Sequence, residues 1–173
     1  MEEPKVEPVT FAAGSAVLSP AMEDHLLRVA DFLRQSPFVN LALAPTPSSA
    51  DADAFRGEAV SARLRDFQRE QGLDDAAAIA AYYKARLPDV PLPPTVDEQL
   101  AFLREREPVP DALLAELGRR RVEATRERLV TTEGIPPARL ASSAPADAAA
   151  SPASATGGAA PEGRVEFTVL ADE

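Results

Sequence analysis

The chain has 173 residues and a formal net charge of −10, from 28 acidic and 18 basic side chains. This length fits one domain, or one domain with an appendage. The acidic balance argues against a nucleic-acid or anionic-membrane surface, because phosphate groups are bound by clustered lysines and arginines. The absence of cysteine excludes disulfides, thiolate metal sites and thiol nucleophiles.

The beginning of the chain carries no targeting signal. Residues 1–7 lack the positive region and apolar run of a signal peptide, and we interpret them as a linker. No apolar run in the chain reaches the roughly 18 to 20 residues that a membrane-spanning helix needs. If the protein works outside the cytoplasm, we expect its targeting sequence to lie on a longer parent.

The first structural elements follow as strand, helix and strand. Residues 9–11 alternate between apolar and polar, which is typical of a strand. Ser19 followed by Pro20 predicts a helix start, and the amphipathic pattern continues to Gln35. Residues 39–43 alternate again and predict a second strand. This order favours parallel strands connected by a crossing helix.

Two longer helices are predicted over residues 53–71 and 111–133. Gly72 and Gly134 follow them, each succeeded by an apolar residue. Glycine at this position adopts the left-handed conformation that closes a helix, so both ends are well marked. The side chains that we expect to face inward from the first of these helices are Val60, Leu64 and Phe67.

Residues 74–110 read as a helical insertion. An alanine-rich helix is followed by a proline-rich link and then by a second short helix. Thr95 and Glu98 have the spacing of a capping box, in which each side chain satisfies a free backbone amide of the helix start. Further prolines close the insertion.

The C-terminal part is predicted to return to the sheet. Arg139 and Leu140 lead a short strand, and residues 143–163 are almost all small or proline, so we expect a disordered loop. Residues 164–170 form the cleanest alternating strand of the sequence. Because this strand needs earlier strands as partners, residues 8–170 are expected to form one domain.

No catalytic constellation is visible. His25 is the single histidine, and without a second histidine or a cysteine it cannot assemble a zinc site; a partly exposed helix residue is the simpler interpretation. Many aspartates, including Asp51 and Asp53, stand where helices begin, where capping explains them better than acid–base catalysis. We therefore expect no enzyme, no metal and no cofactor.

Arg121 is the more informative residue. A helical wheel places it in the middle of an apolar stripe, whereas Arg119 points away and can pair with Glu123. A guanidinium inside an apolar stripe needs a carboxylate, a carbonyl or an anionic ligand. The sequence leaves open whether Arg121 meets an acid of the protein itself or a ligand.

With these elements in place, the chain resembles an OmpA-like domain. The family has a strand of the form I/V-x-F, a helix with Leu-Ser-x-Arg-Arg-Ala and a closing Arg-Arg-Val-Glu. The matching segments here are Val9-Thr10-Phe11, Leu117-Gly118-Arg119-Arg120-Arg121-Val122 and Gly163-Arg164-Val165-Glu166.

The resemblance implies an α/β (α+β) sandwich with the βαβαβ arrangement, a mixed sheet of three or four strands, helices packed on it and the helical insertion. The insertion, with Tyr82-Tyr83 and Pro108-Val109-Pro110, looks like the divergent OmpA-like region at the C-terminal end of large AsmA-like envelope proteins of unknown function. Those are periplasm-facing proteins of Gram-negative bacteria, implicated in outer-membrane assembly or lipid traffic. The implied location is the periplasm or cell envelope, within a longer membrane-anchored parent.

Peptidoglycan-binding members of the family hold the diaminopimelate of the stem peptide with two residues. One is the arginine that matches Arg121, and the other is an aspartate in Gly-His-Thr-Asp after the second strand. This sequence has Pro45-Thr46-Pro47-Ser48 there. Asp51 or Asp53 can replace the aspartate only if the loop folds back.

Two functions of different kinds follow, with a third kept as a remote possibility. The first is a non-catalytic interaction or scaffolding module whose partners are cell-envelope proteins. The second is a peptidoglycan-binding domain with Arg121 as its anchor and Asp51 or Asp53 nearby. The third is an enzyme that depends on His25, for which the sequence offers no orienting group or nucleophile.

Overall fold

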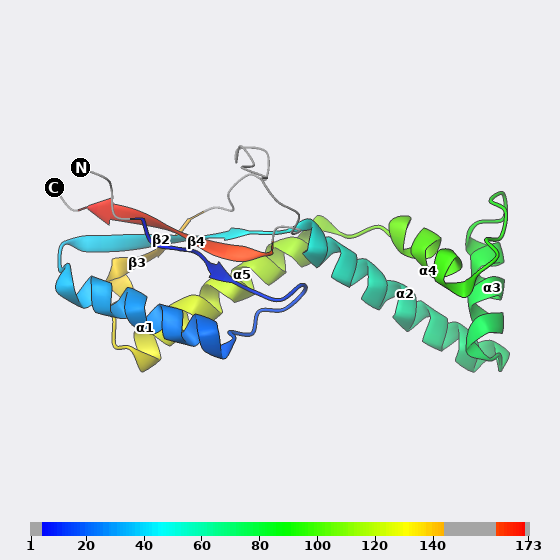
Figure 1. Cartoon of the computed structure of the whole chain (residues 1–173), viewed down its shortest axis with the longest axis horizontal. Coiled ribbons are helices and arrows are strands. Elements are labelled where there is room, and N and C mark those ends of the chain that lie inside the picture. The colour runs from blue at the N-terminus through cyan, green and yellow to red at the C-terminus, as the bar shows by residue number, and fades with distance from the viewer. Residues whose placement is uncertain (1–4, 144–161, 172–173) are drawn as a thin grey trace. The chain divides into compact units, whose positions relative to one another are not determined.

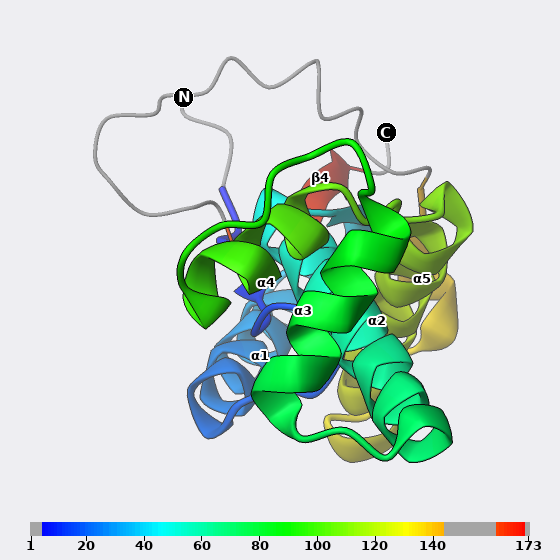
Figure 2. The same cartoon turned by 90° about the vertical axis from the view of Figure 1, so that its right-hand side faces the viewer.

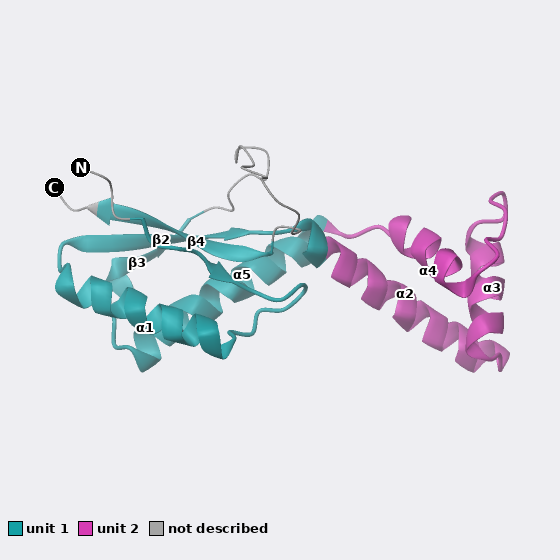
Figure 3. Ribbon diagram, in the orientation of Figure 1, with its two compact units in different colours: residues 1–51, 111–173 teal, residues 52–110 magenta. Residues whose placement is uncertain are grey.

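The computed structural model describes residues 5–143 and 162–171. The chain is of mixed α/β class, with a four-stranded mixed sheet and five α-helices among the described residues (Figure 1). It divides into two compact units, one formed by residues 1–51 and 111–173 and the other by residues 52–110 (Figure 3).

The sheet of the first unit has the strand order β1-β4-β2-β3. Strand β4 runs antiparallel to both of its neighbours, and β2 runs parallel to β3. The prediction that β1 and β2 run in the same direction is confirmed, but β4 separates them. The bounds are Val9–Thr10 for β1, Val39–Thr46 for β2, Leu140–Ser142 for β3 and Arg164–Ala171 for β4.

Helices α1 (Pro20–Gln35) and α5 (Asp111–Glu127) lie on the same face of this sheet (Figure 1). The Ser19 hydroxyl accepts a hydrogen bond from the Met22 amide at 3.3 Å, so the predicted cap is confirmed. The last turn of the predicted 111–133 helix differs in type, because Arg128–Thr132 is a π-helical turn. Gly134 follows with φ of 70°, the left-handed conformation that closes the helix.

The core of the first unit lies between these helices and the sheet. Val165 is fully buried, and Phe167 and Val169 pack against the core, so these alternating residues of β4 share the face that is turned to the core. The buried members of the core are Val9, Phe11, Leu26, Val29, Ala30, Leu33, Leu41, Leu43, Val122, Leu129, Ile135, Leu140 and Val165.

The second unit is helical. It contains α2 (Ser49–Gln71) apart from its first turn, α3 (Asp75–Arg86) and α4 (Val96–Glu105) (Figure 2). Its buried core is formed by Val60, Leu64, Ile79, Tyr83 and Leu103. The unit begins at residue 52 and not at residue 74, where the sequence placed the insertion, because Val60 and Leu64 of α2 pack with α3 and α4.

Local signals mark the helix ends of this unit. The Thr95 hydroxyl accepts a hydrogen bond from the Glu98 amide at 3.2 Å, and the Asp74 carboxylate accepts one from the Ala77 amide at 2.8 Å. Gly72 has φ of 64° after the last residue of α2. The predicted caps are therefore confirmed at Gly72 and, for the hydrogen bond that Thr95 accepts, at Thr95; Asp74 caps α3 in the same way.

Two of the predicted segments are only partly covered. Residues 144–161 of the loop expected at 143–163, and residues 1–4 of the linker expected at 1–7, lie outside the described residues. Residues 5–7 belong to no helix or strand, although Val6 packs against the core of the first unit. Among the helices that the structure describes, none is long and apolar enough to cross a membrane.

Candidate functional site

The predicted site residues Arg121 and Asp51 meet inside the first unit. Helix α5 presents Arg121 on its buried face, and both terminal nitrogens of the guanidinium donate to the Asp51 carboxylate at 2.7 Å. The two side chains are 2% and 0% exposed. This is a bidentate arginine–carboxylate pair, the geometry in which charge-assisted hydrogen bonds are strongest.

The remaining contacts of Arg121 also go to the protein. Its Nε donates to the backbone oxygen of Ser15 at 2.8 Å, and Nη2 donates to that of Ala12 at 3.1 Å. The guanidinium carbon lies 5.2 Å from the centre of the Phe11 ring. The guanidinium is therefore bonded to the segment that follows β1 as well as to Asp51, and burial leaves it almost no contact with solvent.

Asp51 is positioned by the start of α2. The Asp51 amide donates to the Ser48 hydroxyl at 3.2 Å, and the Asp51 carboxylate accepts from the Ser48 amide at 3.1 Å. This reciprocal arrangement is a capping box, and it starts the helix at Ser49 rather than near residue 53 as predicted. The Gly14 amide donates to the same carboxylate at 2.9 Å.

The pKa of Asp51 lies below its ordinary value. Burial by itself raises the pKa, because it disfavours the charged carboxylate. The hydrogen bonds from Arg121, Gly14 and Ser48, together with the positive charge of Arg121, outweigh burial and lower it. Asp51 is thus held as a carboxylate.

Gly163 lies directly against the ion pair. A Cβ atom at this position would overlap Nη1 of Arg121 and Oδ2 of Asp51. The backbone oxygen of Gly163 also accepts a hydrogen bond from the Phe11 amide at 2.9 Å. Only glycine fits here without displacing the pair. Gly163 belongs to the closing motif of the sequence, but no local pattern predicts this role, because its contacts are made across the fold.

Asp53, the third predicted site residue, has a different environment. It belongs to the second unit, where its carboxylate bonds Arg56 at 2.9 Å and its side chain is 70% exposed. The structure therefore joins Arg121 with Asp51 and gives Asp53 a separate partner. The predicted Arg119–Glu123 pair is confirmed at 2.9 Å.

A second acidic residue, Glu107, was not singled out from the sequence. Its side chain is 3% exposed, and its carboxylate lies 2.5 Å from Arg63 and 3.9 Å from Arg86. Arg56 donates to its backbone oxygen at 3.2 Å. No local pattern marks Glu107, because its partners come from α2 and α3, far away in the sequence.

His25 takes no part in either cluster. Its Nε2 lies 2.9 Å from the backbone oxygen of Glu7, and the side chain is half-buried, in agreement with the simpler interpretation of the sequence. Within the described part of the chain, no group of three or more potential metal ligands comes together.

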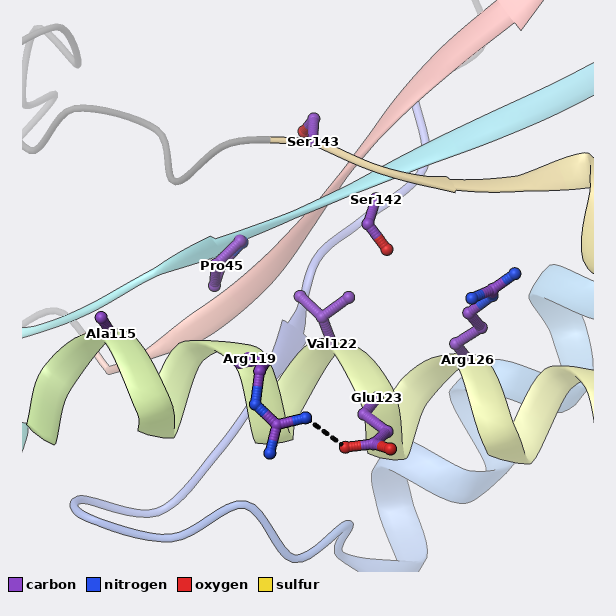
Figure 4. A pocket seen from close by; sticks show the side chains of 8 residues that line it. All are labelled: Pro45, Ala115, Arg119, Val122, Glu123, Arg126, Ser142 and Ser143. Carbon is purple, nitrogen blue, oxygen red and sulfur yellow. Dashed lines mark hydrogen bonds and ion pairs between the residues drawn. The ribbon is translucent and has the colours of Figure 1, made fainter. Parts of the chain in front are cut away.

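A pocket of about 390 Å³ lies elsewhere in the first unit, between α5 and the ends of β2 and β3 (Figure 4). It does not include Arg121, Asp51 or Asp53. Its lining consists of Pro45, Ala115, Arg119, Val122, Glu123, Arg126, Ser142 and Ser143.

The comparison with known proteins adds no family assignment. No family model matches the sequence, and no curated protein matches it either. The functional interpretation therefore depends on the residues themselves. In the described structure, Arg121 and Asp51 satisfy each other's hydrogen bonds and are covered by neighbouring backbone. This arrangement fits a buried structural ion pair better than an open ligand site.

Proposed function

We propose that the chain is a non-catalytic interaction or scaffolding module of a bacterial cell-envelope protein, of the divergent OmpA-like kind found in AsmA-like proteins. The motifs around Phe11, Arg121 and Val165 support this proposal, and the mixed α/β fold is compatible with it. Its partners are then envelope proteins of systems that assemble the outer membrane or move lipids.

One observation carries the proposal. Arg121 matches the ligand-binding arginine of the OmpA-like family, and its guanidinium donates hydrogen bonds to Asp51, Ser15 and Ala12. A ligand carboxylate would have to displace Asp51 from a site without solvent access. Displacement leaves a buried carboxylate unpaired, which is strongly unfavourable. The hydrogen bonds of Arg121 therefore fit a role in holding the fold better than a role in binding a stem peptide.

The alternative is a peptidoglycan-binding domain anchored by Arg121. It is favoured by the fact that Asp51 does reach the arginine, as the alternative requires of a replacement for the missing aspartate. In that case the pair opens, and diaminopimelate places its ammonium on Asp51 and its carboxylate on Arg121.

A titration with free diaminopimelate separates the two. In an amide NMR spectrum of the full chain, we expect the signals of Gly14 and Ser48 to stay unchanged, because both amides are bonded to Asp51. Saturable shifts of these signals would support peptidoglycan binding and contradict our proposal. A pull-down with purified sacculi is the second measurement, for which we expect no saturable retention.

The envelope location needs its own test. An antibody against this chain should detect a protein in the native host that protease digests in spheroplasts but not in whole cells. Protection in spheroplasts with an intact inner membrane would place the protein inside the cytoplasm and overturn the location.

A further inference from the structure

The pocket beside α5 (Figure 4) has a chemical character that the proposed function does not use. We propose that it binds a small carboxylate that carries a short apolar group, either a free acid or the carboxyl terminus of a peptide. This inference is independent of the envelope role and of the Arg121–Asp51 pair.

The pocket lies beside the β2–β3 ladder. Within the described residues, β3 pairs with β2 from Leu41 to Leu43, and the Ser143 amide donates to the Leu43 oxygen at 2.9 Å. The next residue of β2 whose backbone faces β3 is Pro45, which has no N–H to donate. Pro45 therefore offers no backbone donor to β3, and its ring lines the pocket together with Ser142 and Ser143.

The charges of the lining select an anion. Arg119 is already partnered, because it bonds Glu123 at 2.9 Å and Glu116 at 2.7 Å. Within residues 5–143 and 162–171, the Arg126 guanidinium makes no hydrogen bond and no ion pair. Its positive charge is left for a ligand, and a planar guanidinium matches a carboxylate with two parallel hydrogen bonds.

Ser142 supplies a further donor on the same side of the pocket. Figure 4 shows its hydroxyl directed down toward α5, on the side from which Arg126 extends. Pro45, Ala115 and Val122 form the apolar part of the lining. A polar end beside Arg126 and an apolar end beside Val122 fit an amphipathic carboxylate, and the volume lies within the range of small-molecule sites.

The test is an amide NMR titration of the full chain with N-acetyl-L-leucine. N-acetyl-L-leucinamide serves as the matched neutral probe, because it differs only in lacking the charge. We expect saturable shifts of the amide signals of Val122, Ser142 and Ser143 with the acid and none with the amide. No saturable shift at these residues, or equal binding of the amide, would overturn the proposal.

Two variants locate the binding. Arg126→Gln should lower the affinity for N-acetyl-L-leucine about tenfold or more, which is the loss typical of one charge-assisted hydrogen bond. Arg120→Gln is the control, because Arg120 is an exposed arginine of the same helix outside the pocket. If the two variants bind N-acetyl-L-leucine with equal affinity, Arg126 is not the residue that binds the carboxylate. Both changes are on exposed side chains, and an otherwise unchanged spectrum shows that the fold is kept.

Hexanoate distinguishes the two sources of the carboxylate. If it shifts the same signals as N-acetyl-L-leucine, a free acid suffices. If N-acetyl-L-leucine binds and hexanoate does not, the site reads the carboxyl terminus of a peptide. Both outcomes support the proposal, whereas failure of N-acetyl-L-leucine to bind rejects it, whatever hexanoate does.

Discussion

In the described part of the chain, each unit buries one carboxylate against arginine, but the two surroundings differ. In the first unit both partners of the Asp51–Arg121 pair are excluded from solvent, with exposures of 0% and 2%. In the second unit only Glu107 is buried, because the Arg63 and Arg86 side chains are about half exposed, at 45% and 46%. A carboxylate and a guanidinium therefore meet without solvent access in the first unit and with solvent access in the second.

The difference determines what happens when one partner is removed. A cation left behind in the first unit has no water to replace its partner, so the loss is large. In the second unit the arginines turn toward solvent, and the ion pair is close to the exposed kind that contributes little. The two units can be followed separately, because both tyrosines of the chain, Tyr82 and Tyr83, lie in the second unit.

The largest effect is expected from Asp51→Ala. This change leaves Arg121 buried without its counter-ion and should reduce the free energy of unfolding of the first unit by about 3–5 kcal/mol. Denaturant unfolding followed by the amide signals of the sheet measures it. Tyrosine fluorescence, which reports the second unit, serves as the internal reference.

The double variant Asp51→Leu with Arg121→Met is the control for Asp51→Ala. It removes both charges and should be more stable than the single variant. A double variant that is less stable than Asp51→Ala would contradict the role of the unpaired charge.

A smaller loss is expected from Gly163→Ala. The new methyl group has to displace the ion pair or the backbone, and overpacking of this kind costs about 1–3 kcal/mol. The matched control is Gly57→Ala in α2, where the added Cβ would lie 3.7 Å from Nε of Arg104, an ordinary contact. If both variants unfold at the wild-type denaturant concentration, Gly163 does not cover the pair as described.

Glu107→Gln should reduce the free energy of unfolding of the second unit by a still smaller amount, about 1 kcal/mol. Denaturant unfolding followed by tyrosine fluorescence measures it. The amide keeps a hydrogen-bond acceptor for Arg63, and the half-exposed arginines are hydrated. Glu105→Gln is the control, because Glu105 is the exposed last residue of α4 and lies two residues before Glu107. A loss as large as that of Asp51→Ala would show that solvent access does not separate the two clusters.

The most gradual effect is the acid response of the first unit. Because the folded-state pKa of Asp51 lies below its ordinary value of 3.8, its charge contributes stability that is fully present above that pH. The contribution is lost as the pH falls from 3.8 through the lower folded-state pKa. An NMR titration of the Asp51 carboxyl carbon measures this pKa directly, and a midpoint at or above 3.8 would contradict the prediction.

Local signals in the sequence were sufficient for much of the fold. The caps at Ser19 and Thr95 and the glycines after two helices are decided within a few residues, so they could be predicted. The position of β4 between β1 and β2 could not, because strand pairing depends on contacts across the whole chain.

The candidate site was predictable to a similar extent. Arg121 stands out because a charge in an apolar stripe needs a partner, but the sequence could not decide between Asp51 and a ligand. Ser48 and Asp51 have the spacing of a capping box, and this signal could have placed Asp51 in the first helical turn. Gly163 and Glu107 carry no local signal, because only tertiary contacts give them their roles.

The location of β4 has a consequence for biosynthesis. This strand lies between β1 and β2, yet it comes after the other three strands of the described sheet in the sequence. On the ribosome, the continuous segment 52–110 can complete its helical core while later residues are still being added. The sheet and the contact of Gly163 with the Arg121–Asp51 pair can form only after Gly163 and β4 have left the ribosome. A nascent chain that stalls before residue 163 therefore exposes an incomplete sheet to chaperones.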